Sequence, residues 1–189
     1  TSLNSQSFDF LVNPYGSNFP KDGWKALHRF FRGGGNWLNL GGVPFSAPVR
    51  REAAGWHIEA RQTQFHKKLG ITQAFPVSGK KISSYRAAGK NPGAQSAITE
   101  LTVDEIYELY VRFTDTVDVP AEGGSAGARD ATLIPLVHGF SDDGQRLAAP
   151  VVLIDRMQGD YAGGRWVLAN FKGSLSANAI RSLAGSVVQ

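Results

Sequence analysis

The stretch that most constrains the fold of this chain is residues 8–45, where apolar runs, a helical pattern and glycine turns follow one another. Residues 8–12 are apolar at almost every position, as in a strand that is covered on both faces. Residues 22–32 carry apolar side chains at helical spacing, and a second apolar run follows at residues 36–40. Because the crossover between two such strands is right-handed, the pattern predicts two parallel neighbouring strands joined by a helix.

Two glycine clusters mark the ends of these elements. The triplet at residues 33–35 is predicted to cap the helix, since a helix C-terminus often requires a residue with positive φ. Gly41 and Gly42 turn the chain sharply after the second strand, which is where several α/β enzymes hold a nucleophile. The turn itself has no Ser, Cys or Asp, and Ser46 lies beyond it without a G-x-S-x-G motif. The elbow therefore has the form of a nucleophile site without the reactive residue.

The rest of the chain is richer in strand patterns than in helix patterns. Residues 79–93 are basic and rich in small side chains, and they predict an exposed loop. Residues 101–119 alternate with period two and predict a strand, with a helix over residues 103–110 as the alternative. Further strands are predicted at residues 131–137, 150–154 and 166–171, with a hairpin turn at residues 142–145. Ser174 is the candidate cap of a final helix.

The composition limits what the chain can do. A length of 189 residues predicts a single domain over residues 1–189 with a core of its own. The absence of cysteine excludes disulfides, cysteine metal sites and a thiol nucleophile. The net charge of +4 comes from scattered basic residues without a nucleic-acid-binding motif, so no nucleic-acid partner is expected.

The sequence also bears on membrane spans, on cofactors and on the cellular compartment. No apolar run approaches the ~20 residues that span a bilayer. His57 and His66 are too far apart in sequence for a helical metal pair, and we expect neither a metal nor a cofactor. The compartment stays open, since the lack of cysteine is compatible with a secreted or periplasmic protein as well as with others.

Two blocks of the sequence resemble the class I glutamine-amidotransferase-like fold, in the version seen in ThuA-like proteins and in domains attached to β-galactosidase-type glycoside hydrolases. The first block is FDFLVNPYG at residues 8–16, the helix, and FRGGGNWLNLGG at residues 31–42. The second is APVVLID at residues 149–155 and GGRWVLANF at residues 163–171. The resemblance implies a flavodoxin-like α/β fold, an open and mostly parallel sheet with helices on both faces, followed by a strand-rich second half.

The sequence departs from active amidotransferases in two respects. Those enzymes need a Cys at the elbow and a later His–Glu pair that generates its thiolate, so a chain without Cys has no amidotransferase activity. The opening strand and helix of the fold are not visible before Phe8. We therefore expect a shortened variant, or part of a longer multidomain protein, whose exposed edge strand favours pairing with another domain or subunit. The resemblance implies a non-catalytic domain in a protein that handles carbohydrate.

The first functional hypothesis is an accessory or ligand-binding domain of a carbohydrate-active protein, with its pocket beyond the strand ends. The candidate ligand-binding residues are Asn13, Tyr15, Gly42, Phe45, His138, Asp155 and Arg156. Aromatic rings would stack on the apolar faces of a sugar, and the polar side chains would bind its hydroxyls. Two alternatives are simpler: Trp37 is a core residue, and Asp155 and Arg156 form a surface ion pair.

Two further hypotheses remain. A glycoside hydrolase, or part of one, would use paired carboxylates, either Glu52 with Glu59, or Asp155 or Glu59 with a partner and His138 nearby. It requires two carboxylates in one cleft within roughly 5–10 Å. A structural domain that mediates oligomer or interdomain contacts would instead show a flat apolar surface. The expected partners are therefore a carbohydrate and other domains or subunits of the same protein.

Overall fold

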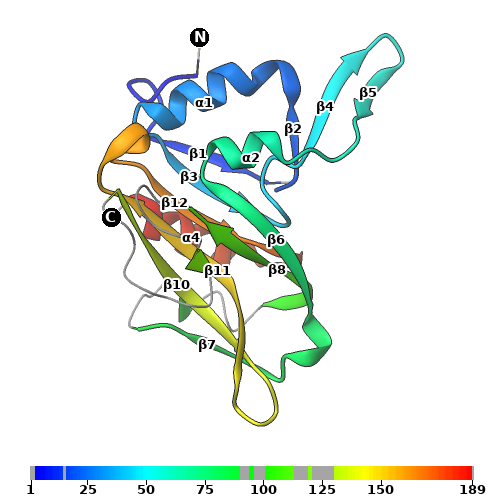
Figure 1. The fold of residues 1–189 in the computed structure, drawn as a ribbon, viewed down its shortest axis with the longest axis vertical. Helices are drawn as coiled ribbons and strands as arrows, with labels where there is room; N and C mark the ends of the chain where they lie inside the picture. Colours follow the sequence, from blue (N-terminus) through cyan, green and yellow to red (C-terminus); the bar gives the residue numbers. More distant parts are fainter. Residues whose placement is uncertain are drawn as a thin grey trace.

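Strands from both ends of the sequence meet in one six-stranded sheet. The computed structural model describes residues 3–14, 16–89, 94–95, 101–112, 119–120 and 130–188. The strand order of this main sheet is β1 (Phe10–Asn13), β3 (Asn36–Leu40), β12 (Arg165–Ala169), β11 (Arg146–Arg156), β10 (Ala131–Phe140) and β7 (Ser84–Ala87), as Figure 1 shows. The predicted α/β class is therefore confirmed.

The sequence led us to expect a mostly parallel sheet. This prediction is wrong, because the main sheet is mixed. β3 runs parallel to both of its neighbours, β1 and β12, whereas the pairs β12–β11, β11–β10 and β10–β7 are antiparallel. A tight turn at residues 141–145 joins β10 to β11, and Gly144 adopts a φ of 80° in it. A tight turn can join only antiparallel strands, because a parallel pair needs a long crossover.

The predicted β-α-β unit forms at the beginning of the main sheet. α1 (Trp24–Arg32) connects β1 to β3, and Leu11 lies opposite Trp37 in the parallel register. Gly34 follows the helix end with a φ of 78°, as the predicted cap requires. Val12 is exposed, so the prediction of a strand covered on both faces is wrong for this residue. β1 is an edge strand and has a neighbouring strand on one side only.

Two smaller sheets complete the fold. One is β2 (Asn18–Pro20), β4 (Ala47–Glu52) and β5 (Gly55–Ile58); the other is β13 (Phe171–Ser174), β8 (Thr102–Val111) and β6 (Ile71–Ser78), with β9 (Val119–Pro120) beside β8. In Figure 1 the β4–β5 hairpin projects from the body as an arm. β8 confirms the strand prediction over its helical alternative. β7 corrects the prediction of an exposed loop, because its backbone pairs with β10.

The helical segments are short. Besides α1 they comprise α2 (Gln64–Lys68), α4 (Ala177–Val188) and 3₁₀ helices at Lys21–Gly23, Gly79–Lys81 and Gly159–Tyr161. The side chain of Ser176, not Ser174, caps α4 by accepting a 3.1 Å hydrogen bond from the Ala179 N–H, because Ser174 still belongs to β13. In the described part of the chain, no helix has the length and apolar character that crossing a membrane requires.

Each face of the main sheet carries a hydrophobic core. Side chains alternate along a strand, so Trp37 and Trp166 face one side and pack with Phe31 of α1. Leu38 and Val167, one residue further along, face the other side and form a second core with α4. Helices therefore cover both faces, as predicted.

Candidate functional site

The glycine elbow lies at the carboxyl end of β3, at residues 41–46. Gly41 and Gly42 have φ values of 80° and 69°, which L side chains rarely adopt. Their N–H groups donate hydrogen bonds of 2.9 and 3.1 Å to the carbonyls of Ala169 and Phe171. The elbow is thereby fastened to the link between β12 and β13, and its position relative to the main sheet is set by backbone contacts.

Phe45 occupies the unusual backbone position of this elbow. Its φ is 51°, and among the described residues it is the one non-glycine residue with positive φ. Its ring is fully buried, stacks on Trp37 at 4.9 Å, and meets Phe19 and Trp24 edge-on. Such a conformation persists only where the surroundings hold it. The strained non-glycine position of the elbow is thus occupied by a core ring.

Two adjoining pockets open beside the elbow, and together we call them the elbow groove. The first, of about 310 Å³, is lined by Gly41 and Gly42 and by the side chains of Tyr107 and Lys172. The second, of about 360 Å³, is lined by polar side chains that include Ser46, Thr63, His66, Lys67 and Thr72. Arg61 lines both pockets and lies between them. The groove lies where a ligand is expected in an open α/β sheet, beyond the carboxyl end of a strand.

His66 is the most deeply buried polar side chain of the groove, with 3% of its surface exposed. Burial, and then the nearby Lys67 charge, lower its pKa to about 4, against a hydrogen bond to the Pro44 backbone that favours the charged form. The imidazole is therefore uncharged at neutral pH. Its buried Nδ1 has no hydrogen-bond partner within the described chain. The lone pair of this nitrogen is buried beside the second pocket and does not face its open space.

The buried Asn39 and Asn170 and the half-buried Asn13 are chain neighbours of residues that line the first pocket. The Asn13 amide donates to the Gly16 carbonyl at 3.0 Å and to Asn39 Oδ1 at 3.3 Å. The Asn170 amide donates to the Tyr107 carbonyl. Within the described chain, Asn39 Nδ2 and Asn170 Oδ1 have no partner. Buried polar groups are nearly always satisfied in native proteins, so these two atoms are exceptions beside the groove.

The structure brings only part of the predicted site together. Gly42 lines the groove, and Asn13 lies next in the chain to a residue that lines it. Phe45 and Trp37 are fully buried, and their rings pack in the core. For Phe45 this corrects the prediction of a ligand-binding residue, and for Trp37 it confirms the simpler interpretation as a core residue. Tyr15 lies outside the described residues.

His138, Asp155 and Arg156 lie away from the elbow. Because β11 is antiparallel to β12, Asp155 lies opposite Arg165 at the amino end of β3, about 13 Å of strand from the elbow. His138 is level with the elbow but lies three strands away from β3, about 14 Å across the sheet. The prediction assumed that all carboxyl ends meet at one edge, which holds only for parallel strands.

Arg156 is a buried structural residue and does not form the surface ion pair with Asp155 that the sequence suggested. Its Nη2 donates to the Leu69 carbonyl at 2.7 Å, and its Nη1 lies 3.5 Å from Asp130 Oδ2. The guanidinium lies 4.6 Å above the Trp166 ring. Burial is the main reason that its pKa falls to about 10, so it stays charged at neutral pH. Arg156 therefore ties the segment after α2 to the main sheet.

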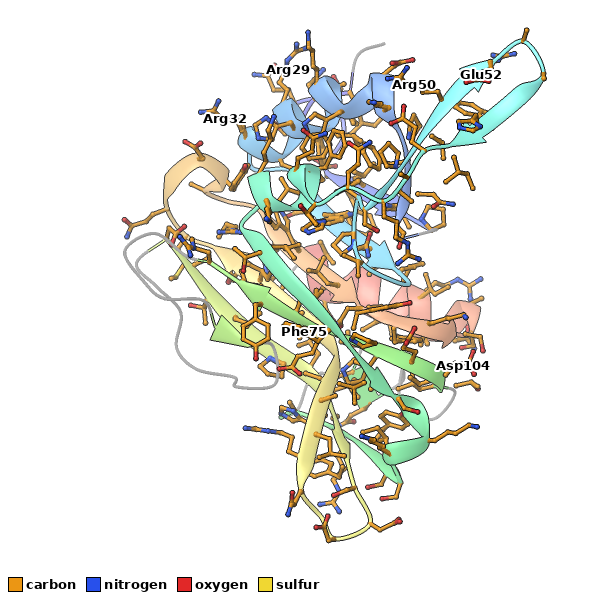
Figure 2. The ribbon with its side chains drawn as sticks, turned by 45° about the vertical axis from the view of Figure 1, so that its right-hand side comes forward. Arg29, Arg32, Arg50, Glu52, Phe75 and Asp104 are labelled. Carbon is orange, nitrogen blue, oxygen red and sulfur yellow. The ribbon has the colours of Figure 1, made fainter. Side chains whose placement is uncertain are left out.

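None of the proposed carboxylate pairs shares a cleft. Glu59 is bound by Lys21 at 2.7 Å, by Arg50 and by the Gln62 amide, and the Lys21 bond is the main cause of its lowered pKa. Glu52 lies near the tip of the arm (Figure 2), about 13 Å of strand away. Asp155 lies at the opposite end of β3. Within the described ranges, no group of three or more His, Asp or Glu side chains could hold a metal ion.

The groove residues that the sequence did not indicate are Arg61, His66, Lys67, Tyr107 and Lys172. They come from three separate segments: the α2 region, β8 and β13. α2 is held near the elbow by Phe65, which packs edge-on against Phe19 at 4.8 Å and Trp24 at 5.1 Å. An apolar residue at position 65 predicts that one face of α2 is buried. The sequence does not show which element that face packs against.

Comparisons with known proteins do not assign the chain to a family. No family model matches it, and no curated protein matches it. Among solved structures, the β-galactosidase of Rahnella sp. R3 aligns at 12% identity with a TM-score of 0.45, over 96% of this chain and 23% of that one. A catalytic mutant of Gan42B, a GH42 β-galactosidase from G. stearothermophilus, aligns at 14% identity with a TM-score of 0.46, over 94% of this chain and 21% of that one. The chain thus spans about a fifth of their length, and scores of this size carry no functional conclusion.

Proposed function

We propose that this chain is a non-catalytic ligand-binding domain, of the class I glutamine-amidotransferase-like type, in a carbohydrate-active protein. The amidotransferase-like assignment, and a flavodoxin-like arrangement of the first unit, rest on the two sequence blocks and on β1–α1–β3 with its glycine elbow. The carbohydrate assignment rests on the sequence resemblance together with the polar lining of the groove.

The observation that carries the proposal is the pairing of an inert elbow with an open polar groove. Phe45 fills the strained position of the elbow with a buried ring, which cannot attack a substrate. The groove beside it nevertheless offers hydroxyl, imidazole and cationic side chains around about 360 Å³. Few but well-placed polar groups in a concave site are typical of ligand binding.

A thermal-shift screen against neutral and acidic mono- and oligosaccharides, with reducing-sugar release followed in the same wells, tests this function. A ligand that binds only the native state raises the melting temperature, so we expect a shift of several degrees without sugar release. Sugar release that survives repurification would contradict a non-catalytic role. A screen without any shift would contradict ligand binding.

A second candidate function, a structural contact to another domain or subunit, is favoured by the β4–β5 arm. Trp56 and Ile58 are 64% and 58% exposed, and they lie on the same face of β5, two residues apart. An isolated two-stranded hairpin is only marginally stable in water. An arm with two large exposed apolar side chains is therefore suited to packing against a partner.

Light scattering after size-exclusion chromatography separates the two candidates. If the arm mediates self-association, the wild-type chain is larger than a monomer and the double variant Trp56→Ser, Ile58→Ser is monomeric. A wild-type chain that is monomeric at all concentrations, together with sugar binding in the thermal screen, supports the ligand-binding role instead.

A further inference from the structure

The lining of the elbow groove is strongly biased in charge. Arg61, Lys67 and Lys172 contribute three cations, whereas the described residues that line the two pockets include no Asp or Glu. Arg61 lies at the junction of the pockets and interacts with the Tyr107 hydroxyl. A cationic cleft concentrates anions in its neighbourhood.

The nearest acidic side chains do not cancel this charge. Glu105 lies opposite Lys172 in the β8–β13 pair and also interacts with Tyr107, so it offsets one of the three cations. Glu59, close in sequence to Arg61, already pairs with Lys21 and Arg50. The second pocket, between Arg61 and Lys67, therefore keeps its positive charge.

The same pocket also presents neutral polar groups. Hydroxyl groups come from Ser46, Thr63 and Thr72. The Ser46 hydroxyl donates a 3.1 Å hydrogen bond to the Val43 carbonyl. The Ser46 oxygen can still accept a hydrogen bond from a ligand. Acceptors of this kind suit a ligand that carries hydroxyl donors as well as a negative charge.

We propose that the elbow groove binds a sugar that carries an anionic group, a carboxylate or a phosphate, with Arg61 as its central contact. This inference rests on the proposed function and specifies its ligand class. The Arg61 guanidinium can bind a carboxylate or phosphate through two parallel hydrogen bonds, and charge-assisted bonds of this kind are about twice as strong as neutral ones. Lys67 adds a second charge, and the neutral groups of the second pocket bind the sugar hydroxyls.

Isothermal titration calorimetry with D-galacturonate, galactose 6-phosphate, D-galactose and inorganic phosphate tests the inference on the full chain. We expect at least one anionic sugar to bind about tenfold or more tightly than galactose and than inorganic phosphate, with an affinity that falls as salt is added. The comparison between galacturonate and galactose 6-phosphate identifies the anionic group.

Variants assign the contact. Arg61→Gln and Lys67→Gln should each weaken binding of the anionic sugar about tenfold and leave the melting temperature of the free protein unchanged. Lys25→Gln, on the exposed face of α1, is the matched control and should bind like wild type. Unaltered binding by Arg61→Gln would overturn its assignment.

Other outcomes separate this inference from the function it rests on. Equal binding of galactose and galacturonate would overturn the anionic preference but leave a sugar-binding domain. Inorganic phosphate binding as tightly as the sugars would overturn sugar recognition. No binding of any of the four probes, in a chain that also shows no shift in the oligosaccharide screen, would overturn both proposals.

Discussion

The backbone of Phe45 is held in an unfavourable conformation by the packing of its own side chain. The rings of Phe19, Trp24, Phe31 and Trp37 surround it with centroid distances from 4.9 to 5.9 Å. We expect Phe45→Ala to destabilise the chain by about 3–5 kcal/mol, because the cavity is added to the lost burial. Urea unfolding measures this, with Phe75→Ala as the control: Phe75 is 47% exposed and should cost less than about 1 kcal/mol. Equal costs would contradict the packed cluster.

The buried His66 predicts a dependence of stability on pH. Its pKa is about 4 in the folded state and 6.5 in the unfolded chain, so the unfolded state binds more protons between these values. Stability is therefore complete above pH 6.5 and is lost as the pH falls toward 4, by up to about 3 kcal/mol from this group.

Urea unfolding at several pH values checks the contribution of His66. His66→Gln should flatten the decline between pH 6.5 and 4.5, whereas His57→Gln, on the exposed arm, should keep the wild-type slope. His28 and His138 also have pKa values lowered chiefly by burial, so part of the slope remains in both variants. Identical slopes in His66→Gln and wild type would contradict the buried, neutral imidazole.

At the scale of elements, the loop between β1 and β2 is pressed against the elbow. Gly16 has a φ of 50°, and a Cβ built on it would overlap the Gly41 carbonyl oxygen. Its own carbonyl accepts hydrogen bonds from Asn13 and from the Phe45 N–H. The close approach of two backbones thus determines where the elbow groove lies relative to β1.

Gly16→Ala should therefore cost at least about 3 kcal/mol or prevent folding, because a backbone segment has to move. Gly144→Ala provides the matched comparison: Gly144 has a φ of 80°, and a Cβ there meets nothing within 4 Å. It should cost only the backbone term of about 1–2 kcal/mol. Thermal and urea unfolding of both variants give the difference, and equal stabilities would show that the loop can shift away from the elbow.

At the scale of the whole molecule, the main sheet couples two cores. Trp37 and Trp166 on one face and Leu38 and Val167 on the other come from the same two strands, so neither core can loosen without disturbing β3 and β12. The chain should therefore unfold in a single cooperative transition, as most domains of this size do. Arg156 adds a link across the first core, between β11 and the carbonyl of Leu69.

Leu183→Ala, in the core beside α4, tests the coupling. The variant should lose about 2–5 kcal/mol. The described part of the core beside α4 contains no tryptophan, so the near-UV circular dichroism of the tryptophans reports on the other core. It should show the same lowered midpoint as far-UV circular dichroism. A midpoint that falls by far-UV but not by near-UV circular dichroism would mean that the two cores unfold independently.

The sequence alone predicted the β1–α1–β3 unit, the glycine elbow and the hairpin turn before β11. These features depend on local patterns: the helical spacing of Trp24, Phe30 and Phe31, the positive φ that glycine permits, and the right-handed crossover. Whether a strand lies in the main sheet or in a loop depends on distant partners instead. The strand β7 was therefore missed, because only its pairing with β10 makes residues 84–87 a strand.

Only the tertiary structure decided the composition of the site. The direction of β11 in the sheet placed Asp155 at the far end of β3. In the sequence, Asp155 and the glycine elbow look equivalent, because each lies at the end of a predicted strand. Arg61, His66 and Lys172 line adjoining pockets because aromatic packing holds α2 near the elbow and backbone bonds hold β13 there. A local pattern determines how a segment folds, but contacts between segments far apart in sequence determine which side chains share a groove.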